Sequence, residues 1–258
     1  MSLEEKTKEI KSPVIVGDSG GGIEMPTSFL SEVAPAAAEP VNDQLTVMTY
    51  FPSAVYSIVR RDFLDVARKV STEFLKQAQK DRPKLDPIYP VYQTDNLFTD
   101  ARMRPFMDYV GATVWNVLES QGYDMNNLDV TFYEMWCQEH HRHSAMDEHV
   151  HNRGAQIVGF YFLDVPQDSS KIIVHDPRPA KKQINLPEKD MTQVTYASDM
   201  INFAPKPGML FMANSWLPHS FGRHAGTKPV RFIHFTAGVT AKQTFTPAPV
   251  MPSTAVIV

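Results

Sequence analysis

The sequence predicts a mainly β fold with flanking helices, in which two sheets roll into a double-stranded β-helix, or jelly roll. Two observations lead to this prediction. From residue 129 onward, short apolar segments are separated by prolines and glycines, a pattern typical of double-sheet β proteins. Before them, two segments carry apolar residues at helical spacing. Many short strands with only two helices, which would cover a sheet, favour a jelly roll over a parallel α/β fold.

The 258 residues are expected to form three parts. Residues 1–44 contain glycine-rich and alanine–proline stretches, which predict a flexible N-terminal arm. Residues 45–240 are expected to be one jelly-roll domain with two covering helices. Residues 241–258 carry several prolines and form a C-terminal tail. Either arm could instead order on a neighbouring subunit, so a homo-oligomer formed through the terminal arms stays open.

Composition excludes several classes of protein. The chain is 43% hydrophobic and 21% charged with a net charge of -4, so no basic field attracts nucleic acid or an anionic membrane. No apolar run is long enough to span a bilayer, and the first residues lack the apolar core of a signal peptide. The single cysteine, Cys137, excludes an internal disulfide. We therefore expect a cytoplasmic protein without nucleic-acid or membrane partners.

The first half of the domain is expected to be largely helical. Residues 45–51 predict a strand that ends at Pro52. Residues 62–80 predict an amphipathic helix, because apolar residues recur every three or four positions and Asp62 suits its N-terminus. Residues 80–99 are polar and contain prolines, which indicates a loop. A second helix is predicted after Pro105, with Gly122 as its stop.

The second half is expected to consist of strands. Residues 129–136 alternate along an extended chain, and residues 156–163 are nearly all apolar, as in a central strand. Further short apolar segments predict strands at 171–174, 193–196, 200–203, 209–213 and 230–236.

Two histidines just before the apolar run 157–163 predict a metal site. Residues i and i+2 of an extended chain point to the same side, so His149 and His151 can direct their rings to one ion. Neutral imidazole is the commonest protein metal ligand. His219 follows a predicted strand in a Trp-Leu-Pro-His corner and supplies a third ligand, which leaves coordination positions open for substrate.

Two further side chains could bind an anion. Arg231 lies inside an apolar strand, where a charge is costly unless it is paired. A structural salt bridge, an outward-facing position and a clamp for a dicarboxylate are all open for it. Tyr161 could place its hydroxyl on a bound carboxylate, or it could be a core residue.

Other candidates have ordinary explanations. His140, His141 and His143 are expected to be surface or hydrogen-bonded core histidines. Cys137 is expected to be a buried thiol. A turn accounts for Asp176 and Pro177, and Arg178 is a weaker candidate for the cleft.

These motifs, in their order, resemble a known family. The set comprises His149-Val150-His151, Gly159-Phe160-Tyr161-Phe162-Leu163, His175-Asp176-Pro177-Arg178, Pro207-Gly208-Met209-Leu210-Phe211, Ser215-Trp216-Leu217-Pro218-His219-Ser220 and Arg231. It resembles a branch of the Fe(II)- and 2-oxoglutarate-dependent oxygenases that is common in phages and marine bacteria. The resemblance implies a double-stranded β-helix with Fe(II) in its mouth. It also implies 2-oxoglutarate anchored by Arg231.

One departure from the family concerns the metal ligands. The family usually binds iron through two histidines and one carboxylate, and His151 stands where the carboxylate is expected. The branch that this chain resembles often has His-x-His there. Asp147 could instead supply an oxygen ligand, whereas Glu148 would point away from the histidines.

The resemblance implies a hydroxylase that acts on a small-molecule or peptide substrate not revealed by the sequence. Two alternatives stay open. One is a cupin-like dioxygenase with three histidines that does not use 2-oxoglutarate. The other is a non-catalytic jelly roll, for example a virion or assembly component, with the terminal arms as its support.

Overall fold

The structure is a computed structural model that describes residues 49–242. The chain divides into two compact units, Met1–Tyr50 and Phe51–Val258, and every helix and strand below belongs to the second. The expected arm at 1–44 and most of the tail at 241–258 lie outside the described residues, so the arms and an oligomer formed through them stay predictions.

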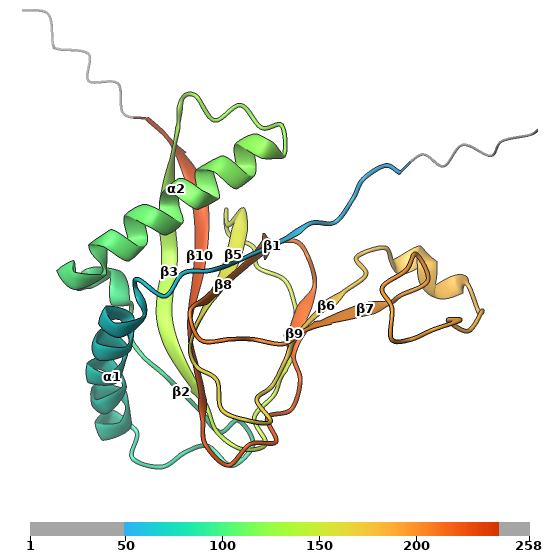
Figure 1. Cartoon of the computed structure of the whole chain (residues 1–258). Helices are drawn as coiled ribbons and strands as arrows, with labels where there is room; N and C mark the ends of the chain where they lie inside the picture. The colour runs from blue at the N-terminus through green and yellow to red at the C-terminus, as the bar shows by residue number, and fades with distance from the viewer. Residues whose placement is uncertain (1–48, 243–258) are drawn as a thin grey trace, which may run out of the picture. The chain divides into compact units, whose positions relative to one another are not determined.

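Two antiparallel sheets form the body of the second unit (Figure 1). The six-stranded sheet has the order β1-β8-β5-β10-β3-β2, and the four-stranded sheet has the order β4-β9-β6-β7. These sheets are those of the predicted jelly roll. The strands are β1 Val55–Val59, β2 Val91–Gln93, β3 Leu128–His140, β4 Met146–His149, β5 Ile157–Asp164, β6 Ile172–His175, β7 Met200–Phe203, β8 Met209–Asn214, β9 His219–Phe221 and β10 Val230–Ala241.

Two helices cover the outer face of the six-stranded sheet (Figure 1). They are α1, Leu64–Asp81, and α2, Arg104–Ser120. Both were predicted. Helix α2 has Pro105 in its first turn, and its C-cap Gln121 is followed by Gly122, whose φ of 94° suits glycine. Asp62 does not cap α1, because its carboxylate pairs with Arg60 at 2.7 Å.

One apolar core lies between the helices and the six-stranded sheet, and a second, largely aromatic one lies between the two sheets. Phe160 and Phe162 from β5 contact Phe221 from β9, which stacks on Phe232 from β10 at 4.9 Å and 7°. All four are buried. These rings fill the jelly roll below the position of the predicted site.

A β-bulge interrupts the pairing of β3 with β10. Thr236 pairs with Glu134 and Ala237 pairs with Phe132, so Tyr133 is the extra residue. Such a bulge lets two successive side chains face the same way. Phe132 therefore packs toward the helices, while Tyr133 and Glu134 reach a pocket at the other face.

Three details of the predicted strands were wrong. The first described strand is β1, after Pro52, because residues 49–51 are not in a strand and residues 45–48 are not described. Residues 193–196 form turns closed by Ser198 rather than a strand. The predicted loop at 80–99 contains β2, whose three residues pair with the end of β3.

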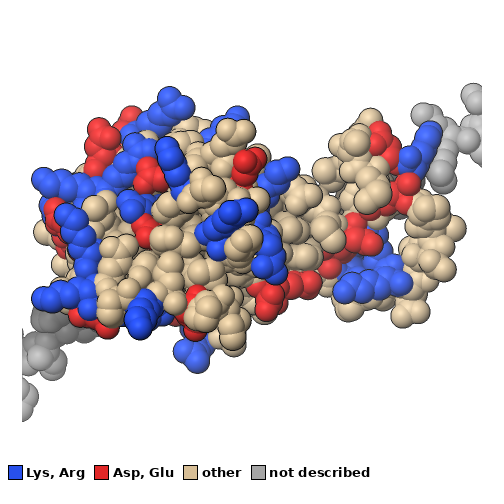
Figure 2. All heavy atoms as spheres, turned by 90° about the horizontal axis from the view of Figure 1, so that it is seen from below, with Lys and Arg blue, Asp and Glu red and all other residues tan. Residues whose placement is uncertain are grey.

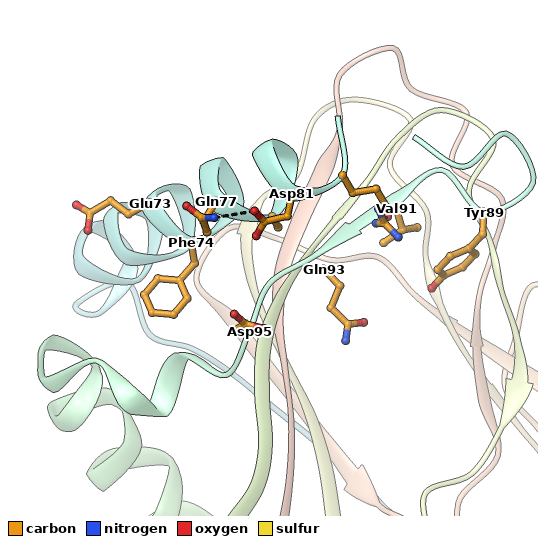
Figure 3. A pocket seen from close by; sticks show the side chains of 10 residues that line it. Glu73, Phe74, Gln77, Asp81, Tyr89, Val91, Gln93 and Asp95 are labelled. Atoms are coloured by element: carbon orange, nitrogen blue, oxygen red, sulfur yellow. Dashed lines mark hydrogen bonds between the residues drawn. The ribbon is translucent and has the colours of Figure 1, made fainter. Parts of the chain in front are cut away.

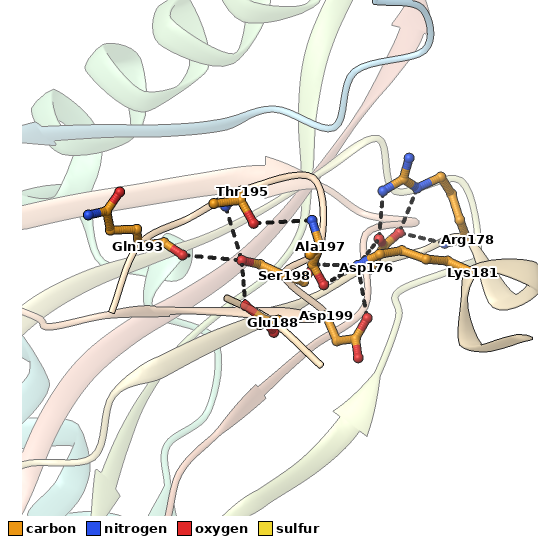
Figure 4. Close-up of polar contacts among 9 residues, drawn as sticks. All are labelled: Asp176, Arg178, Lys181, Glu188, Gln193, Thr195, Ala197, Ser198 and Asp199. Carbon is orange, nitrogen blue, oxygen red and sulfur yellow. Dashed lines mark hydrogen bonds and ion pairs between the residues drawn. The ribbon is translucent and has the colours of Figure 1, made fainter. Parts of the chain in front are cut away.

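The segment between β6 and β7 projects from the four-stranded sheet (Figure 1). It contains a 3-10 helix, Pro179–Gln183, and a polar network in place of an apolar core (Figure 4). Lys181 is the centre of this network, with its ammonium 2.8 Å from Asp199 and 3.3 Å from Asp176. Polar contacts therefore hold this segment together.

Candidate metal centre

Three histidines converge where β4 meets β9. His149 ends β4 and pairs directly with His219, the first residue of β9. His151 lies two residues beyond β4. The ring centroids are 4.5 Å apart for His149 and His219, 5.1 Å for His149 and His151, and 5.3 Å for His151 and His219. Each ring offers a nitrogen within 4.8 Å of the nitrogens of the other two.

Backbone carbonyls orient two of these rings. Nδ1 of His149 lies 2.8 Å from the carbonyl oxygen of Asp147, and Nδ1 of His219 lies 2.9 Å from that of Leu217. A carbonyl can only accept, so each Nδ1 carries the proton and each Nε2 has a free lone pair. Metal-bound histidines are held in this way by their outer hydrogen bonds.

The free nitrogens fit a cation. Nε2 of His151 and Nε2 of His219 are buried and have no hydrogen-bond partner within residues 49–242. Burial lowers the pKa of both rings to about 4. Both are therefore neutral at pH 7, which is the form that binds metals. An unpartnered buried nitrogen is costly, and a bound ion would satisfy it.

The cluster contains no carboxylate among the described residues. Asp147 is exposed and contributes only its backbone oxygen, to His149. Glu148 turns away, as predicted, and lies 3.5 Å from Nδ1 of His175. The site therefore offers three imidazoles and no carboxylate from the described residues.

A fourth imidazole, from His234, was missed by the sequence reasoning. His234 is 3% exposed, lies 5.0 Å from the ring of His151, and stacks on Trp136 at 5.0 Å and 19°. Nδ1 of His234 and Nε1 of Trp136 are buried without a partner in the described part of the chain. The sequence signal that could have identified His234 is the alternation along β10, which places it on the same face as Phe232 and Thr236.

Arg231 does not join the histidines. Its guanidinium pairs with Glu139 on β3 and lies 3.8 Å from Asp164 on β5. Both acids also contact α1, through Gln79 at 3.2 Å and Arg68 at 3.0 Å. Arg231 therefore lies on the helix-facing side of the six-stranded sheet, while His234, three residues along, lies on the inner side. The structure does not place Arg231 beside the histidines, and the open salt-bridge alternative describes its surroundings. Its role as the anchor of 2-oxoglutarate stays a prediction.

Tyr161 also faces the helices. Its hydroxyl donates to the carbonyl oxygen of Arg60 at 2.6 Å, and its ring packs on Phe106 of α2 at 4.9 Å. Burial raises the pKa of Tyr161 to about 12. The structure thus supports the core alternative for this residue and does not bring its hydroxyl to the histidines.

The remaining candidates are apart from the cluster. His140 is buried with Ser144 and Gln138 as hydrogen-bond partners. Arg178 pairs with Asp176 at 2.7 Å in the projecting segment (Figure 4). Cys137 is buried, and burial raises the pKa of its thiol to about 12.

A pocket of ≈ 400 Å³ opens beside His151 and is called the mouth pocket below. It is lined by Tyr133, Glu134, Val150, His151, Asn152, Arg153 and Thr236. A larger pocket of ≈ 730 Å³ lies between α1 and β2, where Glu73, Asp81 and Asp95 contribute to its lining (Figure 3). None of the clustered histidines lines that larger pocket, so size alone does not locate the site.

The face of the molecule seen from below carries charged side chains of both signs (Figure 2). On the face shown in Figure 2, Lys and Arg side chains are interspersed with Asp and Glu. Among the described residues, neither helix has the length and apolarity needed to cross a membrane.

Comparison with known proteins finds one matching family model and several structures of similar fold. Residues 134–235 match the family model described as "Putative 2OG-Fe(II) oxygenase". AviO1 from Streptomyces viridochromogenes Tue57 has a TM-score of 0.50 at 13% identity, covering 76% of this chain and 93% of that one. A prolyl-4-hydroxylase from Pseudomonas putida has a TM-score of 0.48 at 10% identity, covering 74% and 94%. No curated protein sequence matches the chain. At 13% identity, the likeness to AviO1 shows a shared fold and nothing about its reaction.

Proposed function

We propose that His149, His151 and His219 hold the catalytic iron of a 2-oxoglutarate- and Fe(II)-dependent oxygenase, the family whose model residues 134–235 match. The observation that supports this assignment is the convergence of three imidazole nitrogens within 4.8 Å. The predicted family, jelly-roll fold and oxygenase class are confirmed; the ligand roles of the three histidines are our proposal.

The residues of the chain would position the reactants. The iron, when bound, supplies the oxygen chemistry of the family. The carbonyls of Asp147 and Leu217 hold two rings with Nε2 toward the ion. Phe160 packs against His219 and His234, so the inner wall beside the ion is apolar and excludes water. The mouth pocket next to His151 leaves the ion accessible from one side.

A second candidate is a dioxygenase with three histidines that does not use 2-oxoglutarate. Two observations favour it: the cluster lacks a carboxylate, and Arg231 pairs with Glu139 away from the cluster. This candidate predicts oxygen consumption that is independent of 2-oxoglutarate.

We further propose that the substrate is a small molecule or a peptide and that the protein acts in the cytoplasm. The mouth pocket of ≈ 400 Å³ has the size of sites for small ligands. The buried free thiol of Cys137 suits a reducing compartment. Fractionation of cells that produce the tagged chain tests the compartment, and recovery from an exported fraction would contradict it.

The direct test of function is release of succinate from 2-oxoglutarate. Purified protein with Fe(II), ascorbate and 2-oxoglutarate should form succinate slowly even without a prime substrate. His219→Ala should abolish this release, while His143→Ala, a change at an exposed histidine, should leave it unchanged. Oxygen consumption without succinate would favour the second candidate. A wild-type protein that binds no metal and releases no succinate would indicate a non-catalytic jelly roll.

A further inference from the structure

Among residues 49–242, the core between the two sheets is apolar and offers no cation for the distal carboxylate of 2-oxoglutarate. Below the histidines the space is filled by the aromatic core of Phe160, Phe162, Phe221 and Phe232. Arg231 lies on the opposite face, paired with Glu139. A carboxylate held in a low-dielectric site needs a charged partner. If the chain binds 2-oxoglutarate, that partner must come from elsewhere.

The mouth pocket supplies a cation beside a proposed ligand. Arg153 lines this pocket together with His151, two residues before it. Its guanidinium makes no hydrogen bond or ion pair to any residue between 49 and 242. Arg231 is already neutralised by Glu139, whereas Arg153 is free to pair with a ligand.

A tight turn holds Arg153 in place. Arg153 and Gly154 have φ values of 58° and 86°, and the amide of Ala155 donates to the carbonyl of Asn152 at 3.3 Å. This is the pattern of a type I′ turn, whose central positions favour glycine, asparagine or aspartate. An arginine in this left-handed conformation is strained, and such strain is often found at functional sites.

Close packing fixes the turn against the sheet. A Cβ on Gly238 would lie 2.5 Å from the carbonyl oxygen of Gly154, and a Cβ on Gly154 would lie 3.2 Å from the Tyr133 hydroxyl. Glycine at both positions therefore lets the turn lie directly on β10 and on the ring of Tyr133. The base of the Arg153 side chain is held by rigid elements.

The β-bulge in β3 adds a hydrogen-bond donor to the same pocket. Tyr133 is the extra residue of the bulge and lines the mouth pocket with Arg153. Its hydroxyl has no hydrogen-bond partner among the described residues. Bulges often redirect a side chain beside an active site. Tyr133 thus takes the position that the sequence reasoning assigned to Tyr161.

We propose that Arg153, assisted by Tyr133, binds the distal carboxylate of 2-oxoglutarate in the mouth pocket. This inference rests on the proposed function, because it needs the keto acid end at the histidine-bound ion. Glu134 shares the pocket, and its carboxylate accepts from the Thr236 hydroxyl at 3.4 Å. No ion pair joins Glu134 to Arg153 within the described part of the chain, so the guanidinium stays available.

Calorimetric titration into nickel-loaded protein tests the inference without turnover. The ligands are 2-oxoglutarate and 2-oxobutanoate, which keeps the keto acid end and lacks the distal carboxylate. The wild type should bind 2-oxoglutarate about 10- to 100-fold more tightly, the strength expected of a charged hydrogen bond. Arg153→Gln should abolish this preference and leave 2-oxobutanoate binding unchanged. Tyr133→Phe should reduce the preference by roughly 2- to 10-fold.

Two control variants separate a specific effect from a general one. Arg142→Gln removes another exposed arginine and should keep the wild-type preference. Arg231→Gln, assayed below its melting temperature, should also keep it. The inference is overturned if Arg153→Gln retains the preference, or if Arg231→Gln loses it. It is also overturned if nickel-loaded wild type binds no 2-oxoglutarate; that result would remove this cosubstrate from the proposed function, while nickel binding, titrated separately, would still support the metal centre.

Discussion

The ion pair between Arg231 and Glu139 is partly buried on the helix-facing side of the six-stranded sheet. The Glu139 side chain is 2% exposed, and that of Arg231 is 28% exposed. Gln79 and His141 also donate to Glu139, at 3.2 and 2.8 Å, so this carboxylate is fully surrounded. The pair belongs to the packing of α1 on the sheet.

Removing one partner of this ion pair should therefore lower the stability of the fold without affecting metal binding. We expect Arg231→Gln to lower the free energy of unfolding by about 3 kcal/mol, because a buried carboxylate is left without its cation. Urea denaturation measures this loss. The double variant Arg231→Met with Glu139→Leu should recover part of it. An Arg231→Gln protein as stable as the wild type would contradict a structural role.

Residue type and spacing predicted part of the site, but not every residue that lies there. The spacing of His149 and His151 predicted their convergence, and His219 joined them as expected. The spacing could not predict which face of the sheet Arg231 occupies, because that face depends on the register of β10 against β3 and β5, which is a tertiary property. Local spacing gave no reason to select Arg153 either, since its importance depends on a pocket built by a distant strand.

At the level of elements, β5 and β10 approach each other closely at Gly159. A Cβ at this position would lie 2.1 to 2.7 Å from three ring atoms of Phe235, whose side chain is completely buried. Any larger residue would push this buried ring into its packed neighbours, so glycine allows the two strands to pair here.

Gly159→Ala should destabilise the fold by about 1–3 kcal/mol through overpacking. Gly111→Ala is its matched control. Gly111 lies inside α2, and its added Cβ would meet only Phe132, at 3.8 Å. This control should stabilise the helix by roughly 0.5–1 kcal/mol. Urea midpoints of the two variants should thus shift in opposite directions; equal midpoints would contradict the packing described here.

Both helices and most strands could be predicted from apolar periodicity, because each buries one continuous face. The bulge at Tyr133 could not, since the run from Phe132 to Trp136 alternates regularly in sequence while the pairing with β10 does not. The short strands β2, β4 and β9 were missed because they have few residues, and their partners are distant in sequence.

Over the whole molecule, buried histidines connect stability to pH. Burial lowers the pKa of His140 to about 3, and that of His151 and His219 to about 4, from an ordinary value of 6.5. In the unfolded chain these rings take up protons near pH 6.5, while in the folded chain they do so only near pH 3–4. Their contribution to stability is therefore complete above pH 6.5 and is lost as the pH falls.

Metal-free protein should become less stable between pH 7 and pH 5, before most carboxylates titrate. Each histidine contributes a slope of at most about 1.4 kcal/mol per pH unit. Urea denaturation at several pH values measures the combined slope. His140→Gln should make this pH slope shallower, because it removes one of the rings whose pKa burial lowers. The change leaves the metal centre intact, because His140 lies apart from it. Stability that does not change over this range would show that the rings are not buried as neutral groups.

The account depends most on the three histidines binding one cation. Anaerobic titration with Fe(II), or with nickel as a redox-stable substitute, tests this claim most directly. We expect one equivalent per chain for the wild type and for His143→Ala. His149→Ala, His151→Ala and His219→Ala should each lose more affinity than the 10- to 100-fold that loss of an outer hydrogen-bond partner costs. Wild-type protein that binds no metal, or a variant lacking all three histidines that binds it equally well, would contradict the account.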